Sequence, residues 1–118
     1  MKILSQSQIR EADEFTISHE PIASIDLMER AAGECSDWIV KNYGKEFLCL
    51  FICGNGNNGG DGLAIARQLS EKGFSVEIYI LKVSSTDSAD FSVNLKRLSE
   101  NKIPFKIISD ADEIIFRG

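Results

Sequence analysis

The segment "GNGNNGGDG", residues 54–62, constrains the fold more than any other part of this chain. Glycine, asparagine and aspartate disfavour strands and helix interiors, so the segment predicts an ordered loop rather than a regular element. The apolar run "FLCLFIC" (47–53) precedes it, and "LAIARQLSEKG" (63–73) follows with the spacing of a short helix that Gly73 ends. A strand, a glycine-rich loop and a helix in this order are typical of anion-binding α/β folds.

Two helices are predicted before this unit. "SQSQ" (5–8) is a capping-box pattern that starts a short polar helix to about Ile17, and Pro21 breaks the chain after it. A second helix is predicted from Ser24 to Asn42, because apolar residues recur there at steps of three and four. Its apolar stripe consists of Met28, Ala31, Ala32, Cys35 and Ile39.

The remaining elements alternate between strand and helix. "SVEIYIL" (75–81) predicts a second strand, residues 88–100 a helix, and "PFKIIS" (104–109) a third strand, while "DADEIIFRG" (110–118) is assigned no element. This order is the βαβαβ half of a doubly wound sheet. The predicted fold is therefore a Rossmann-like, three-layer αβα domain with a mostly parallel sheet, preceded by two helices and incomplete within residues 1–118.

The position of the first strand in the sheet is open. Residues 47–53 show no polar alternation, which predicts a central strand that is covered on both faces and has two neighbours. A strand order of 3-2-1-4 would take one neighbour from sequence beyond Gly118 and leave an unpaired edge here. The rival order 2-1-3 would place the first strand between the other two.

Composition narrows the function classes. With 118 residues and 43% hydrophobic residues, the chain is expected to be a single globular domain. The net charge of −5 argues against nucleic acid or an anionic membrane as partner. No apolar run is long enough to span a bilayer, and the start of the chain does not resemble a signal or transit peptide. Three cysteines in apolar surroundings predict free thiols in a cytoplasmic protein.

The glycine-rich segment is not an ordinary dinucleotide fingerprint. Residues 54, 56 and 59 satisfy G-x-G-x-x-G, but the second strand is followed by Lys82 instead of a ribose-binding acid. Asp61 would repel a pyrophosphate at the helix start, and no Walker lysine follows the glycines. A purely structural alternative makes Asp61 an N-cap, and Asn57 and Asn58 turn residues with positive φ. The functional interpretation is a site for a cation beside a polar ligand.

The stretch "GNGNNGGDGLAIARQL" (54–69) resembles the signature of the NAD(P)H-hydrate epimerases, the family built on the YjeF N-terminal domain. "LMERAA" (27–32) resembles the upstream helix of that family, so the similarity extends along the chain. The resemblance implies a Rossmann-like homodimer that interconverts the R and S epimers of hydrated NADH and NADPH. It also implies that substrate contacts come from Asn57, Asn58, Gly59, Gly60 and Asp61. Asn58 would ligate a potassium ion.

The resemblance places the catalytic acid/base and a second potassium ligand beyond residue 118, because "DADEIIFRG" does not match the family segment that leads to them. Asp110 and Asp112 are therefore not assigned to catalysis. Two other functions remain open: a non-catalytic dimerisation scaffold, as the same domain serves in mRNA-decapping enhancers, and a generic nucleotide-binding module. The intact N-N-G-G-D favours the enzyme over the scaffold, and the missing ribose acid disfavours the generic module.

Four further residues are interpreted structurally. His19 is predicted to be a loop histidine, and Trp38 a packing residue or dimer contact. Cys53, at the end of a buried strand, is predicted to be an inert thiol. Arg67 either pairs with nearby carboxylates or lies on an exposed helix face, and its spacing does not decide between these.

Overall fold

The computed structural model describes residues 24–114, and within this range strands and helices alternate along the chain. The predicted first helix and His19 lie outside the described residues. The elements are α2 (Ser24–Asn42), β1 (Leu48–Cys53), α3 (Asn57–Glu71), β2 (Ser75–Leu81), α4 (Ala89–Glu100), β3 (Lys106–Ile108) and the 3-10 helix η1 (Ala111–Glu113).

The three strands form one parallel sheet in the order β1-β2-β3. β1 pairs with β2 over six residue pairs, from Leu48↔Ser75 to Cys53↔Ile80. β3 pairs only with the end of β2, from Tyr79↔Lys106 to Leu81↔Ile108. β2 is therefore the middle strand, which rules out the order 2-1-3 and agrees with the 3-2-1 part of the other order. Among residues 24–114, β1 has one neighbour, not the two that its apolar sequence predicted.

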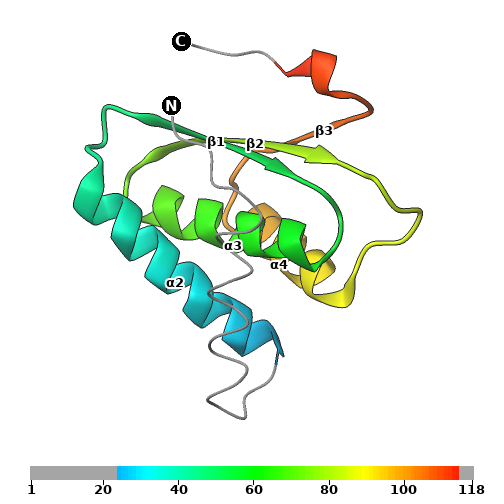
Figure 1. The fold of residues 1–118 in the computed structure, drawn as a ribbon, viewed down its shortest axis with the longest axis horizontal. Coiled ribbons are helices and arrows are strands. Elements are labelled where there is room, and N and C mark those ends of the chain that lie inside the picture. Colours follow the sequence, from blue (N-terminus) through cyan, green and yellow to red (C-terminus); the bar gives the residue numbers. More distant parts are fainter. Residues whose placement is uncertain (1–23, 115–118) are drawn as a thin grey trace.

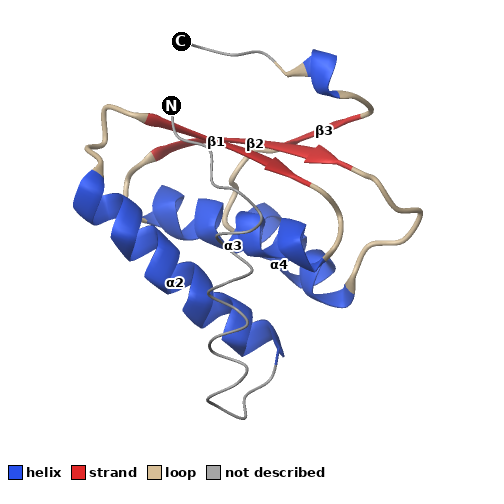
Figure 2. Cartoon of the chain, viewed as in Figure 1, coloured by secondary structure: helices blue, strands red, loops and turns tan. Residues whose placement is uncertain are grey.

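The helices α2, α3 and α4 lie on the same side of the sheet (Figures 1 and 2). α3 lies between the other two and packs against both. Its side chains Leu63, Ile65 and Leu69 are completely buried. The main core fills the space between these helices and the strands and includes Phe51 and Ile80. Burial of these α3 side chains stabilises the two-layer arrangement.

A smaller apolar cluster covers the opposite face of the sheet, where Leu50, Tyr79, Ile108 and Ile114 pack together. The coverage of β1 is uneven, because Leu50 is 1% exposed whereas Ile52 is 40% exposed. The prediction that β1 is covered on both faces therefore holds for Leu50 but not for Ile52. The Rossmann-like α/β class is confirmed, and the described residues contribute the sheet and the helical layer on one face.

Two helix ends follow simple local rules. After α3, Gly73 has a φ of +89°, a left-handed conformation that L side chains rarely adopt, and it closes the helix as predicted. Before α4, Ser88 accepts a hydrogen bond from the amide of Phe91 (3.2 Å) and caps the helix. These ends position the connections between strands and helices.

Candidate functional site

The glycine-rich segment is mostly helical, which corrects the predicted loop. α3 begins at Asn57, six residues before the predicted start, with Gly56 as an extended N-cap at φ −97° and ψ −166°. Asp61 is the fifth residue of the helix, so the prediction that it could be an N-cap is wrong. Tertiary packing overrides the weak helix propensity of glycine here, because residues 59–69 of the helix are buried.

Asn57 and Asn58 form the first turn of α3. Among the described residues, the non-glycine residue with positive φ is Lys102, so the interpretation of these asparagines as left-handed turn residues is wrong. Asn57 is exposed and Asn58 is half-buried. The helical hydrogen-bond ladder begins with the amide of Gly60, which donates to the carbonyl of Gly56 (3.0 Å). The earlier amides thus have no carbonyl of their own helix to bind, and they carry the positive end of the helix dipole.

The glycines that follow allow close packing. A Cβ atom at Gly59 would overlap the carbonyl oxygen of Gly54, and one at Gly62 would lie 2.7 Å from Cys53 Sγ. A Cβ at Gly60 would lie 3.3 Å from Met28 Sδ and from the Phe91 backbone. At Gly56, by contrast, a Cβ would meet no atom within 4 Å. The buried glycines therefore bring α3 against β1, α2 and α4, a role that the sequence did not predict.

Asp61 is a buried carboxylate within this packed region. Its residue exposure is 2%, and it follows Gly60, which lies against α2 and α4. A carboxylate is costly to remove from water unless its charge is compensated, so burial distinguishes Asp61 from the exposed acids of this chain. It lies three residues after Asn58, a spacing that places both side chains on the same side of the helix.

Asn55 is the site residue that the sequence interpretation missed. It is completely buried and its Nδ2 donates to Ser84 O (2.9 Å) and Asp87 Oδ1 (3.0 Å). Its Oδ1 accepts from the amides of Val83 (3.1 Å) and Ser84 (3.2 Å), and its own carbonyl accepts from Ser88 N (3.0 Å). Asn55 therefore ties the connection after β2 to the connection after β1. The available signal was its position two residues after a strand and between two glycines.

Both connections lie at the carboxyl edge of the parallel sheet. The ends of β1 and β2 are paired as neighbours, and the helices that follow them, α3 and α4, begin close together where Gly60 meets Phe91. Lys82 follows β2 directly, and its Nζ lies 3.5 Å from Asp87 Oδ1. Ligands of open α/β sheets bind at this edge, and two helix N-termini there favour negatively charged or polar groups.

Arg67 pairs with carboxylates and joins the helices. It is 8% exposed, forms a short ion pair with Glu29 of α2, and donates to Glu71 at 2.8 Å. Arg97 of α4 also reaches Glu29, at 3.5 Å. Burial alone would raise the pKa of Glu29, but hydrogen bonds from Arg67 and Gln68 and the two positive charges outweigh it and hold this pKa below 4.5. This network stabilises the helical layer at a distance from the sheet edge.

Cys53 and Trp38 lie in surroundings that favour structural roles. Burial raises the pKa of Cys53 to about 12, so its thiol stays protonated and unreactive at neutral pH, as predicted. Trp38 is 50% exposed, and its ring centroid lies 6.0 Å from that of Tyr43.

Between residues 24 and 114 no group of three or more His, Cys, Asp or Glu side chains could hold a metal ion. No helix of that range is long and apolar enough to cross a membrane.

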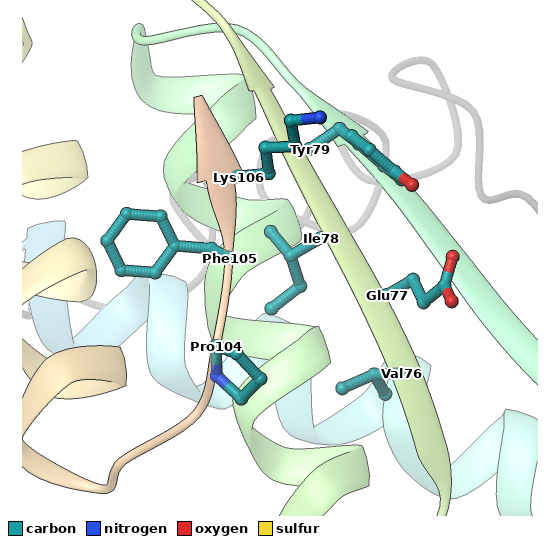
Figure 3. A pocket seen from close by; sticks show the side chains of 7 residues that line it. All are labelled: Val76, Glu77, Ile78, Tyr79, Pro104, Phe105 and Lys106. Carbon is teal, nitrogen blue, oxygen red and sulfur yellow. The ribbon is translucent and has the colours of Figure 1, made fainter. Parts of the chain in front are cut away.

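Two shallow depressions lie elsewhere on the surface. One, of about 260 Å³, forms beside the first half of β2, where β3 has not yet begun to pair with it (Figure 3). Its lining comprises Val76, Glu77, Ile78, Tyr79, Pro104, Phe105 and Lys106. The other, of about 300 Å³, is lined by Glu29, Arg67, Arg97 and Asn101. Neither lining includes the glycine-rich segment.

The sequence profile of the family described as YjeF-related protein N-terminus matches residues 24–115. The chain belongs to this family. Membership covers the region from α2 to the end of η1, and therefore includes the glycine-rich segment and the connection held by Asn55.

Several curated relatives in this family carry related names. A protein of Limosilactobacillus fermentum named NAD(P)H-hydrate epimerase is 36% identical over 116 residues, which are 95% of this chain and 56% of that protein. A protein of Anaerococcus prevotii with the same name is 38% identical over 115 residues, 93% of this chain and 51% of that protein. The chain spans about half the length of these relatives.

A solved structure supports the fold. The crystal structure of yeast ynu0, YNL200c, matches with a TM-score of 0.66 and 22% identity, covering 95% of this chain and 49% of that chain. At this identity the match shows the architecture. It agrees with the parallel sheet and the helix arrangement of this chain.

Proposed function

We propose that this chain contributes the substrate-binding half of an enzyme that epimerises the R and S forms of hydrated NADH and NADPH. The observation that carries the proposal is the arrangement around Asn55, which holds the glycine-rich start of α3 beside the connection after β2 in a member of this family. The relatives named NAD(P)H-hydrate epimerase supply the reaction class.

The proposed substrate contacts are Asn57, Asn58, Gly59, Gly60 and Asp61. Asn57 and Asn58 offer side-chain amides, and backbone N–H groups that bind no carbonyl of their own helix, at the positive end of α3, and such groups suit phosphate and hydroxyl oxygens. Gly59 and Gly60 are packed against neighbouring elements, so their contribution would come through the backbone. Asp61 is buried and could accept hydrogen bonds from a ligand that covers the first turn of the helix.

We further propose that Asn58 ligates a potassium ion through its side-chain oxygen. The residues fit such an ion, because an amide oxygen is a suitable hard ligand and the buried Asp61 carboxylate lies one helical turn away. A bound potassium ion would supply positive charge near the phosphates of the substrate. Asn58 would orient the ion, and Asp61 would offset the unfavourable approach of a cation to the positive helix end.

The acid/base group of the reaction is proposed to lie outside residues 1–118. Asp110 and Asp112 belong to the turn of η1, where Asp110 Oδ1 accepts a hydrogen bond from the amide of Asp112 (2.7 Å). Both residues are exposed, which supports a structural role in this turn. We also propose a cytoplasmic homodimer, and the half-exposed ring of Trp38 is a candidate contact for it.

The proposal is tested by Asp61→Ala and Asn58→Ala in the full-length protein. Asp61→Ala should lower kcat/KM for epimerisation by about two orders of magnitude or more, since it removes a buried charge from the ligand side of the helix. Asn58→Ala should raise the KM for the hydrates most strongly when potassium is scarce. Chromatographic separation of the two epimers over a potassium series measures both effects.

The matched control is Asp37→Ala, which removes an exposed carboxylate that pairs with Lys72 at the far end of α2. Its epimerisation rate should equal that of the unmodified protein. Thermal melting of each variant shows whether it folds. A folded Asp61→Ala protein with unchanged kcat/KM would exclude Asp61 from the substrate site.

A further inference from the structure

The connection after β2, residues 82–88, lies where dinucleotide-binding α/β folds read the adenosine ribose. In such folds an acid near the end of the second strand binds the 2′-hydroxyl, whereas a basic residue accommodates a 2′-phosphate. Here Lys82 follows Leu81, the last residue of β2, and no acid precedes Asp87 in this connection. The residue directly after β2, where such folds recognise the ribose, is therefore the basic Lys82.

The connection has a fixed position relative to α3. Asn55 binds the backbone of Val83 and Ser84 and the side chain of Asp87, and a Cβ at Gly54 would lie 3.6 Å from the Val83 side chain. Lys82 is consequently held at the same sheet edge as the first turn of α3. A ligand whose phosphates reach that turn could place its ribose against this connection.

Among the described residues, Lys82 is the cation that directly follows a strand at this edge. Arg67 is engaged by Glu29 and Glu71 in the helical layer, and Lys72 pairs with Asp37 at 2.8 Å. The side chain of Lys82 is 41% exposed, and its ion pair with Asp87 is long at 3.5 Å. Such exposed pairs are weak, so a phosphate dianion can compete for the ammonium group.

We propose that Lys82 binds the ribose 2′-phosphate of the substrate, together with hydroxyls of the exposed residues Ser84, Ser85 and Thr86. The site then favours the hydrate derived from NADPH over the one derived from NADH. This inference rests on the proposed function. Asp87 stays bound to Asn55 and limits the preference by repelling the phosphate.

The test measures binding of ADP-ribose and 2′-phospho-ADP-ribose to the full-length protein by calorimetry. These probes lack the nicotinamide ring, so they report ribose recognition separately from epimerisation. The unmodified protein should bind the phosphorylated probe about tenfold more tightly, which corresponds to one close charge-assisted contact. Lys82→Gln should remove this difference and leave the affinity for ADP-ribose unchanged.

Two further variants sharpen the test. Lys96→Gln removes an exposed lysine from the middle of α4 and should leave both affinities unchanged. Asp87→Asn keeps an oxygen for Asn55 and removes a negative charge, so it should strengthen binding of the phosphorylated probe two- to threefold. If Asp87→Asn instead weakened ADP-ribose selectively, Asp87 would be the ribose-reading residue and the proposal for Lys82 would be wrong.

The outcomes separate this inference from the proposed function. Equal affinities for the two probes in a protein that epimerises both hydrates would overturn the role of Lys82 alone. Absence of binding together with absence of epimerisation would overturn both proposals. Lys82→Gln weakening both probes equally would show a general charge effect and would also overturn the specificity role.

Discussion

Gly56 and Gly59 lie three residues apart in the same motif and have opposite surroundings. At Gly56 a side chain would extend into open space, whereas at Gly59 it would overlap the backbone carbonyl of Gly54. The exposed rim of the segment, Gly56 to Asn58, thus faces possible ligands. The buried part, Gly59 to Gly62, lies against β1, α2 and α4. One glycine-rich motif therefore combines the proposed binding surface with a close packing contact.

This difference explains why a carboxylate, Asp61, can stand near the end of the segment. In a phosphate-binding loop every glycine amide would face the ligand, and an acid at the helix start would repel it. Here the glycines nearest Asp61 are used for packing, and the carboxylate is a buried part of the helix instead of its cap. The proposed ligand contacts through backbone amides come from the residues before Gly60, whose own amide binds the carbonyl of Gly56.

The largest effect is expected for Gly59→Ala. The added Cβ would meet backbone, which cannot move aside like a flexible side chain, so the free energy of unfolding should fall by about 3 kcal/mol or more. Urea unfolding measures the loss. Gly56→Ala is the matched control and should cost less than about 1 kcal/mol, mainly through a poorer N-cap. Equal losses of unfolding free energy for the two variants would contradict the distinction between the exposed rim at residues 56–58 and the packed residues 59–62.

Asn55→Ala should have the next largest effect. It empties a completely buried position and removes both the acceptor of the Val83 and Ser84 amides and the donor to Asp87, so the free energy of unfolding should fall by about 2–4 kcal/mol. Hydrogen exchange of these two amides should also become faster. Asn42→Ala is the control, because it removes an exposed amide that bonds within α2. Unchanged exchange at both amides would show that Asn55 does not hold the connection.

A smaller, pH-dependent effect is expected at the helical layer. The pKa of Glu29 is lowered in the folded protein, so its pairing stabilises the fold above pH 4.5 and this stability is lost as the pH falls through the lowered pKa. Glu29→Gln should therefore reduce the drop in melting temperature on acidification below pH 4.5. Glu34→Gln, at an exposed position of α2, should show the same drop in melting temperature on acidification as the unmodified protein. An identical acid profile in the Glu29 variant would contradict the assigned pairing.

The smallest effect is expected for Gly56→Ser. Gly56 already has extended N-cap geometry and space for a side chain, so a serine hydroxyl can accept from the first-turn amides. The free energy of unfolding should rise by a few tenths of a kcal/mol, while epimerisation should decrease because the same amides are proposed to face the substrate. Thermal melting measures the change in stability, and the epimerisation assay measures the change in activity. If Gly56→Ser instead lowered the free energy of unfolding, the space beside Gly56 would not accommodate a side chain.

Much of the fold was predictable from local sequence. α2 and β2 have the predicted bounds, because apolar periodicity and a bounded apolar run report directly on a buried helix face and a strand. Gly73 ends α3 as predicted, since a left-handed position selects glycine locally. β3 is shorter than the predicted 104–109, and η1 falls in the stretch without a prediction, because short elements are decided by their neighbours.

The sequence by itself determined the α/β class, the order of elements and the location of the candidate site after the first strand. Only the tertiary structure decided that α3 begins at Asn57, that β2 is the middle one of the three strands within residues 24–114, and that Asn55 joins two connections. Local propensities describe each residue against its chain neighbours. They carry no information about the close approach of the Gly54 carbonyl and the Phe91 backbone, which leaves little or no room for a side chain at Gly59 and Gly60. Such packing stabilises a helix over glycines whose local propensity favours a loop.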